Sequence, residues 1–215
     1  MLLIIGTGGH AKVVYDAAVA MDQATGRERR IVFLTTDSAY APTHPNTNFC
    51  GCPVYYSADN SLSALPETPA SAIVAIGSNG VRRRLSRQLL EAGIPLETII
   101  HPSAILSPSA TIGSGTLVCA GTVVNPDAAI GIGAILNTGS IIEHDCTVGH
   151  FAHISPGAVL AGAVQVGEAA WVGMGARVLP GKHIGKDTIL GAGAVLLQDL
   201  PDGCTAVGVP AHVIN

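Results

Sequence analysis

The sequence predicts two domains of different fold class, an α/β domain in residues 1–98 and a parallel β-helix in residues 99–215. Three observations support this prediction. Short apolar segments alternate with helical patterns in the first part. In the second part an aliphatic residue recurs at every sixth position, and glycine recurs at every eighteenth. The alternation is typical of an α/β domain, and the periods of six and eighteen residues are both typical of a parallel β-helix.

The α/β domain is predicted from three strands and two helices. The strands are the apolar segments 2–5, 31–34 and 73–76, and the helices are 11–21 and 80–92. A glycine-rich turn joins the first strand to the first helix. Strands that alternate with helices form a parallel sheet, and such a turn at a helix N-terminus suits a diphosphate. We therefore expect a Rossmann-like domain that holds a nucleotide-linked substrate through Gly6, Gly8, Gly9 and His10.

Two residues at the ends of the other predicted strands are candidates for the same crevice. Asp37 follows the second strand, and Gly77 follows the third. The carboxyl ends of parallel strands meet at one edge of a sheet, where α/β domains bind ligands. Ala11 stands at the last glycine position of a G-x-G-x-x-G fingerprint, which disfavours a nicotinamide-dependent enzyme.

The hexapeptide period of the second domain is unbroken. Seventeen positions at a spacing of six, from Ile100 to Leu196, are all Ile, Leu or Val, and fourteen of the seventeen positions four residues later are Ala, Ser, Thr or Cys. Three hexapeptides form a triangular coil of 18 residues, with the aliphatic residue inside and the small residue at the corner. Glycines at 113, 131, 149, 167 and 185 recur once per coil, and we expect them to adopt an unusual φ.

Composition excludes several function classes. The net charge of −4 disfavours a nucleic-acid-binding protein. Gly, Ser, Thr, Asn and Pro interrupt the uncharged stretch 104–126, so we expect no membrane span. The first six residues lack the basic segment and long apolar run of a signal peptide, which favours a cytoplasmic protein. The five cysteines and the histidines do not form pairs with zinc spacing, so we expect no metal.

Motifs at both ends of the chain identify a resemblance. The chain has Ile-Gly-Thr-Gly-Gly-His-Ala-Lys-Val-Val at 5–14, Ile-Leu-Gly-Ala-Gly-Ala-Val at 189–195 and Val-Gly-Val-Pro-Ala at 207–211. With the hexapeptides, these motifs resemble the bacterial nucleotide-sugar acetyltransferases of the sialic acid O-acetyltransferase (NeuD-like) family, especially its 4-amino-4,6-dideoxy sugar N-acetyltransferases of the perosamine type. The resemblance implies a left-handed β-helix and a homotrimer that binds acetyl-CoA between neighbouring β-helices.

The segment 137–146 matches the active-site segment of that family. His144 is the predicted general base, because a neutral imidazole accepts protons near pH 7. Asp145 is expected to orient its ring. Gly162 follows His144 by 18 residues and is therefore expected one coil away, with its amide facing the oxyanion that develops during acyl transfer. The resemblance also implies that Asn137 lies near the sugar.

Other residues are expected to bind acetyl-CoA. The resemblance implies that His153 contacts the acetyl donor, and we expect Gly173 and Ala192 to lie along the same molecule. No Lys or Arg occurs between His101 and Ala176, and three cations then follow within ten residues, Arg177, Lys182 and Lys186. Cations suit the phosphates of CoA, and ordinary solubilising charges are the alternative.

The expected reaction is acetyl transfer from acetyl-CoA to the amino group of a UDP- or GDP-linked 4-amino-4,6-dideoxy sugar, in a pathway of lipopolysaccharide or glycan biosynthesis. The amine would attack the thioester directly in a ternary complex, because Cys146 is expected to point inward and to be a poor nucleophile. Two alternatives stay open. One is an O-acetyltransferase that acts on a sugar hydroxyl, as on sialic acid. The other is a hexapeptide carbonic anhydrase with zinc on His144, His150 and His153.

Overall fold

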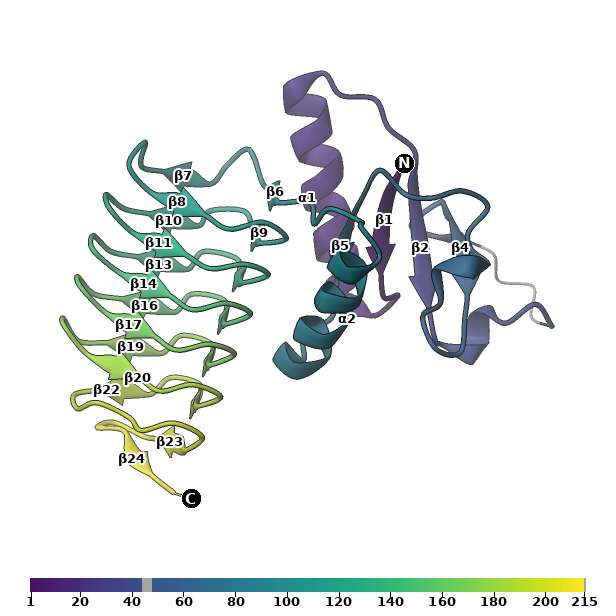
Figure 1. Ribbon diagram of the computed structural model, residues 1–215. Coiled ribbons are helices and arrows are strands. Elements are labelled where there is room, and N and C mark those ends of the chain that lie inside the picture. Colours follow the sequence, from purple (N-terminus) through teal and green to yellow (C-terminus); the bar gives the residue numbers. More distant parts are fainter. Residues whose placement is uncertain (44–47, 215) are drawn as a thin grey trace.

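The computed structural model describes residues 1–43 and 48–214, which form an α/β part followed by a long parallel β-helix (Figure 1). The α/β part is a five-stranded sheet with the strand order β3-β4-β2-β1-β5. Its strands are β1 (Leu2–Ile5), β2 (Ile31–Thr35), β3 (Asn48–Phe49), β4 (Cys52–Tyr56) and β5 (Ser71–Val74). All pairings are parallel except the β3–β4 hairpin.

One helix covers each side of this sheet. Helix α1 (Gly9–Thr25) packs on the side of Leu2 and Ile4, and α2 (Asn79–Glu91) packs on the side of Leu3 and Ile5. Two short 3-10 helices, η1 (Ser38–Tyr40) and η2 (Leu62–Ala64), lie in the connections. None of the helices in the described ranges has the length and apolar character needed to cross a lipid bilayer. The alternating α/β pattern is confirmed, and α1 extends further at both ends than 11–21.

Sequence reasoning missed β3 and β4. Every residue of β4 is half-buried, and the strand contains Pro53, so the segment shows neither a continuous apolar run nor a clear alternation. Its pairing with β2, where Val54 lies beside Phe33, supplies the order that the local pattern lacks. The strand predicted at 73–76 is observed at Ser71–Val74, because Ser71 pairs with the first residue of β1.

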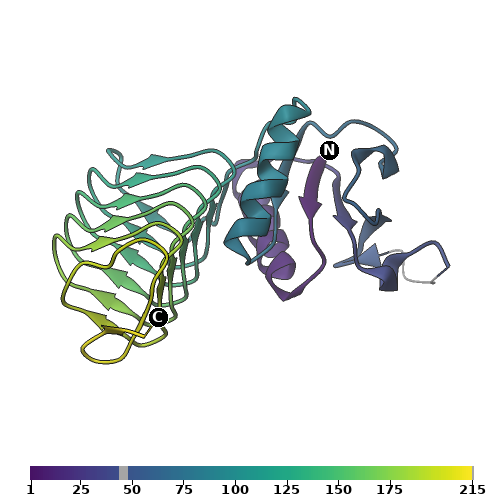
Figure 2. The same ribbon diagram turned by 60° about the horizontal axis from the view of Figure 1, so that its bottom comes forward.

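The β-helix consists of short strands on three faces, which stack in coils (Figure 2). In the described residues every one of these strands has two residues except β23, which has three. Face I contains β6 (Ile99–Ile100), β9 (Leu117–Val118), β12 (Ile135–Leu136), β15 (His153–Ile154), β18 (Trp171–Val172), β21 (Ile189–Leu190), β23 (Thr205–Val207) and β24 (His212–Val213). Face II contains β7 (Ile105–Leu106), β10 (Val123–Val124), β13 (Ile141–Ile142), β16 (Val159–Leu160), β19 (Arg177–Val178) and β22 (Val195–Leu196). Face III contains β8 (Thr111–Ile112), β11 (Ala129–Ile130), β14 (Thr147–Val148), β17 (Gln165–Val166) and β20 (His183–Ile184).

The stacking register confirms the predicted coil of 18 residues. On face II, Val124 pairs with Ile142 and Ile142 with Leu160, so equivalent residues lie directly above one another. The second residue of each strand points into the prism, and these positions are fully or almost fully buried from Val118 to Leu196. The interior is therefore a stack of aliphatic side chains with small residues at the corners.

The glycines at 113, 131, 149, 167 and 185 have a different role from the one expected. None of them has a positive φ. A Cβ atom on Gly149 would lie 2.6 Å from the backbone nitrogen of Glu168 and 2.6 Å from the carbonyl carbon of Gly167 in the next coil. The expectation of an unusual φ was therefore wrong, and glycine recurs at this corner because successive backbones approach too closely for any side chain.

The α/β part docks on face I of the β-helix. The outward side chains of Ile99, Leu117 and Ile135 are at most 2 % exposed, because they pack in one cluster with Val14 and Ala17 of α1. Further along the same face the cover ends, and Trp171 and Ile189 are 45 % and 40 % exposed. His153 lies between these two regions and is 8 % exposed. The end of the covered region therefore falls at a residue that the sequence singles out.

Candidate active site

His144, Asp145 and Gly162 lie together at the corner between faces II and III. His144 follows β13, and its Nδ1 donates to Asp145 Oδ2 at 2.7 Å. Gly162 occupies the same corner one coil further on, where a Cβ atom would lie 2.6 Å from His144 Cε1. The side chains of His144 and Asp145 are each 61 % exposed. The predicted base, its orienting carboxylate and the adjacent glycine are therefore close neighbours, and Nε2 of His144 is left available as a base.

The local charges increase the basicity of His144. The hydrogen bond from the ring to Asp145 raises the pKa of His144 above its usual value, and the negative charges of Asp145 and Glu143 act in the same direction. Asp145 has a φ of 60°, in the left-handed region that Asp adopts more readily than most residues. The corner therefore presents an exposed imidazole whose tautomer and orientation are set by one carboxylate.

The residues predicted to bind the nucleotide sugar gather at the carboxyl edge of the α/β sheet. Gly6 and Gly8 lie between β1 and α1, with Gly8 as the N-cap of the helix and Gly9 as its first residue. Asp37 follows β2 and caps η1 by accepting from the backbone nitrogen of Ala39 at 3.0 Å. Gly77 follows β5. Parallel strands bring these three connections to one edge, as the sequence indicated.

His10, at the start of α1, lies against the β-helix. Its ring centroid is 6.4 Å from that of His153 on β15. Asn137 Nδ2 donates to His153 Nε2 at 3.1 Å, while Oδ1 of Asn137 accepts from the backbone nitrogen of Thr138. The docking of the two parts therefore brings His10, expected at the nucleotide sugar, beside His153, expected at the acetyl donor.

Both imidazoles of this pair are held in the neutral form. Burial, and then the positive charge of Arg82, lower the pKa of His10 to about 4. Burial first, followed by the charges of Arg82 and His10, lowers the pKa of His153 to about 3. Nε2 of His10 and Nδ1 of His153 are buried and have no hydrogen-bond partner. Protonation would place additional N–H donors in a region that lacks acceptors for them.

An apolar groove of about 480 Å³ opens on face I beyond His153. It contains His153, Gly173 and Ala192, three of the residues expected to bind acetyl-CoA. Trp171 forms part of its wall and stacks on His153 with a centroid distance of 5.8 Å and an interplanar angle of 2°. Met174, 61 % exposed, lies at the same groove. The arrangement suits a long, largely apolar arm with a polar group at the His153 end.

The three predicted cations lie outside this groove. Arg177 is the first residue of β19 and is on face II. Lys182 lies at the corner between faces II and III, and Lys186 lies at the corner between faces III and I, after β20. Within one chain, His153, Gly173 and Ala192 therefore lie together in the groove on face I, and the three cations lie on face II or at the corners of the β-helix.

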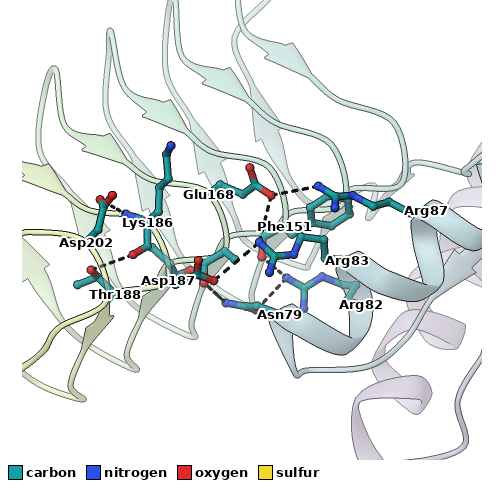
Figure 3. Close-up of polar contacts among 12 residues, drawn as sticks. Asn79, Arg82, Arg83, Arg87, Phe151, Glu168, Lys186, Asp187, Thr188 and Asp202 are labelled. Carbon is teal, nitrogen blue, oxygen red and sulfur yellow. Dashed lines mark hydrogen bonds and ion pairs between the residues drawn. The ribbon is translucent and has the colours of Figure 1, made fainter.

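Sequence reasoning did not assign Arg82 or Trp171 to the site. Arg82 is one of four arginines on α2, and nothing in the neighbouring sequence distinguishes it from the other three. In the structure it is only 2 % exposed. Figure 3 shows that α2 meets the β-helix through Asn79, Arg82 and Arg83. Trp171 is the one tryptophan in the chain and occupies the outward position of a face I strand. That position was the only local signal for it.

The three histidines that a zinc site would use do not meet within one chain. His144 is at the corner between faces II and III, His150 is at the corner between faces III and I, and His153 is on face I. His150 Nδ1 already accepts from the backbone nitrogen of Ile132 at 2.9 Å. Across residues 1–43 and 48–214, no group of three His, Cys, Asp or Glu side chains is arranged to hold a metal ion. Cys146 is fully buried, and burial raises the pKa of its thiol.

Comparison with known proteins identifies the family. Residues 1–89 match the family model described as the PglD N-terminal domain. The crystal structure of PerB from Caulobacter crescentus in complex with CoA and GDP-perosamine is 42% identical, with a TM-score of 0.88, over 100% of this chain and 97% of that chain. The chain belongs to the nucleotide-sugar acetyltransferases of the NeuD-like family. Its α/β part and left-handed β-helix are the fold that the resemblance implied.

Two further proteins are similar to this chain. The acetyltransferase domain of PglB from Neisseria gonorrhoeae is 37% identical, with a TM-score of 0.87, over 99% of this chain and 98% of that chain. UDP-N-acetylbacillosamine N-acetyltransferase of Bacillus subtilis is 37% identical over 117 residues, 54% of this chain and 50% of that protein. The match to this curated relative therefore spans about half of its length.

Proposed function

We propose that this acetyltransferase transfers the acetyl group of acetyl-CoA to the amino group of a UDP- or GDP-linked 4-amino-4,6-dideoxy sugar. The observation that carries the proposal is the meeting of His10, from the glycine-rich turn, with His153, at the end of the apolar groove. The relatives support this chemistry, because one is solved with CoA and GDP-perosamine and another is named a UDP-N-acetylbacillosamine N-acetyltransferase.

The two substrates would approach the histidine pair from opposite sides. The diphosphate of the nucleotide sugar would lie at the N-terminus of α1, on the amides of Gly8 and Gly9, where the helix dipole favours negative charge. Gly6, Asp37 and Gly77 border the same edge. The pantetheine arm of acetyl-CoA would lie in the groove, along Gly173 and Ala192, with the thioester near His153 and Asn137 near the sugar.

The geometry favours an active site completed by a second copy of the chain. Within one chain His144 is at the corner between faces II and III, whereas the groove is on face I. In the homotrimer that we propose, each copy would place its His144 at the groove of the next, and three such contacts close a ring. Arg177 and Lys182 are on the same side as His144, so they would reach the phosphates of the neighbour's CoA. Lys186 lies at a different corner, between faces III and I, so its position does not support a contact with these phosphates.

In this site the chemistry is a direct acyl transfer. The neutral amine attacks the thioester carbonyl while Nε2 of His144 accepts the proton that the nitrogen loses. The amide of Gly162 stabilises the oxyanion of the tetrahedral intermediate. The carbon–sulfur bond then breaks, and the proton passes from His144 to the leaving thiolate. Cys146 does not take part, because its buried thiol donates to the carbonyl oxygen of Ala161 inside the coil.

Mass spectrometry of the products tests the proposal. The protein is incubated with acetyl-CoA and a panel of UDP-, GDP- and dTDP-linked 4-amino-4,6-dideoxy sugars, and each sugar is matched with its 4-hydroxy analogue. We expect one acetyl group on the amino sugars and none on the analogues. Acetylation of the hydroxy analogues would favour the O-acetyltransferase instead, and a panel without any acetylated sugar would contradict the proposal.

The reaction belongs to the cytoplasm, because acetyl-CoA and nucleotide sugars are cytoplasmic metabolites. N-acetylated 4-amino sugars on a nucleotide carrier are activated donors, so the reaction that consumes the product is a glycosyl transfer. We therefore include the protein in glycan or lipopolysaccharide biosynthesis.

Replacement of Asp145 by asparagine should move the pH profile of the enzyme. Asp145 raises the pKa of His144, and His144 acts as a base only when it is neutral. Loss of the carboxylate lowers that pKa, so the acid limb of kcat should shift to lower pH. The plateau of kcat should fall by about tenfold because the ring loses its orienting partner. Steady-state rates between pH 5.5 and 9 measure both effects, and an acid limb that moves upward would contradict the assignment.

A further inference from the structure

Arg82 on α2 is an unusual buried cation. It is 2 % exposed, and in the described parts of the chain no carboxylate pairs with it. Its guanidinium instead donates to backbone carbonyl groups and one side-chain amide, namely Gly133 (2.8 Å), Phe151 (2.6 Å), Ala152 (3.4 Å), Ile76 (3.1 Å), Gly77 (3.3 Å) and Asn79 Oδ1 (2.9 Å). A buried charge without a counter-charge is costly, and this set of acceptors offsets the cost.

Four of these six acceptors belong to the two segments that border the histidine pair, whereas Gly133 lies one coil earlier in the β-helix and Asn79 is on α2 itself. Ile76 and Gly77 follow β5 at the edge that we assign to the nucleotide sugar. Phe151 and Ala152 directly precede His153 in the β-helix. One planar guanidinium therefore holds the side of the site assigned to the sugar and the side assigned to acetyl-CoA at a set separation. The five N–H donors of the guanidinium, in a rigid fork, suit that task.

We propose that Arg82 is a positioning residue that aligns the acceptor loop at Gly77 with the His10–His153 pair and the donor groove. The inference rests on the proposed function, because it assigns these segments to the two substrates. Asn79 strengthens the connection, since its Nδ2 donates to the carbonyl oxygens of Ala169 and Ala170 in the next coil.

The electrostatics of the pair agree with this role. His153 faces Arg82 from α2 and His10 from α1, while its neighbours Trp171 on β18 and Asn137 after β12 are uncharged. The charge of Arg82 adds to burial in lowering the pKa of both histidines. Asn137 Nδ2 donates to His153 Nε2, so protonation of that nitrogen would break the hydrogen bond and displace the ring from the groove.

Kinetics test the positioning. Arg82→Lys keeps the positive charge but cannot span the carbonyl groups of both segments. We expect kcat to fall by about tenfold to a hundredfold, with KM for acetyl-CoA within about twofold, because alignment is lost while the groove is retained. Arg83→Lys is the matched control, since Arg83 is the next residue and pairs with Glu168 at 3.2 Å away from the histidines. Equal losses of kcat in the two variants, or a wild-type kcat in Arg82→Lys, would overturn the proposal.

The single tryptophan gives a second test that needs no catalysis. A protonated imidazole quenches the fluorescence of a stacked indole, so Trp171 reports the protonation of His153. In a His144→Asn background, which removes another titrating histidine, emission is followed from about pH 8 down to about pH 3. With Arg82 present the quenching midpoint should lie at about pH 3. In Arg82→Gln the midpoint should move to higher pH, because a positive charge that opposes protonation is removed while burial remains.

Two results interpret that titration. Adding His153→Gln to Arg82→Gln should abolish the quenching, which assigns the transition to His153. A quenching midpoint in Arg82→Gln equal to the midpoint with Arg82 present, with an unchanged circular dichroism spectrum, would overturn the role of Arg82. Because this readout involves no acetyl transfer, it stands even if the wild-type protein proves inactive on amino sugars. Inactivity of the wild-type protein would reject the proposed function and leave the role of Arg82 untouched.

Discussion

His144→Asn should lower kcat by about 10²- to 10⁴-fold and leave the fold intact, because the amine then loses its proton without a general base. The side chain is 61 % exposed and contributes no contact to the core of the β-helix, so thermal unfolding should be unchanged. KM for acetyl-CoA should stay within about twofold, since His144 acts on the attacking amine and the residues that line the groove on face I are unchanged. Steady-state kinetics on the preferred amino sugar and a thermal melt measure both effects.

A matched histidine separates this loss from a general effect of the substitution. His101, in the first coil, also uses its Nδ1 in a local contact, with Ser103 Oγ at 2.8 Å. His101→Asn should retain wild-type kcat. If His144→Asn turned over amino sugars at the wild-type rate, another group would have to be the base, and the site at the corner between faces II and III would be rejected.

Gly162→Ala should have the second largest effect, a loss of kcat of about a hundredfold. Its new methyl carbon would lie 2.6 Å from Cε1 and 2.7 Å from Nε2 of His144, so the ring has to turn away. The exposed ring can move easily, and the backbone φ of Gly162 is ordinary, so stability should change little. A displacement of about 1 Å of a catalytic group is enough for a loss of this size.

A double-mutant cycle shows whether Gly162 acts through His144. If the methyl group only displaces the base, Gly162→Ala should cost almost nothing further in the His144→Asn background. A full additional loss in the double variant would instead indicate that the methyl group disturbs the site independently of His144. Wild-type kcat in the single variant would contradict the requirement for a glycine beside His144.

The β-helix could be predicted almost completely from the sequence, because its order is local. Each hexapeptide repeats the same requirement for an inward aliphatic residue and a small corner residue, as Ile142 and Cys146 illustrate. The prediction of the α/β part was less complete. Strand β4 was missed because its side chains are only half-buried and its place in the sheet depends on pairing with β2. The glycine column was recognised, but its cause is the close approach of neighbouring coils, which one coil alone does not reveal.

The sequence by itself determined the fold of the second half and the pairing of His144 with Asp145 and Gly162, because adjacency and an 18-residue register bring those three together. Only the tertiary structure decided that His10 meets His153 and that Arg82 holds the segments around them. These contacts join residues far apart in the chain across a docking surface, and no local period encodes such a surface. Burial there, rather than residue type, keeps the two imidazoles neutral and turns one of four arginines into the connection between the two proposed substrate sites.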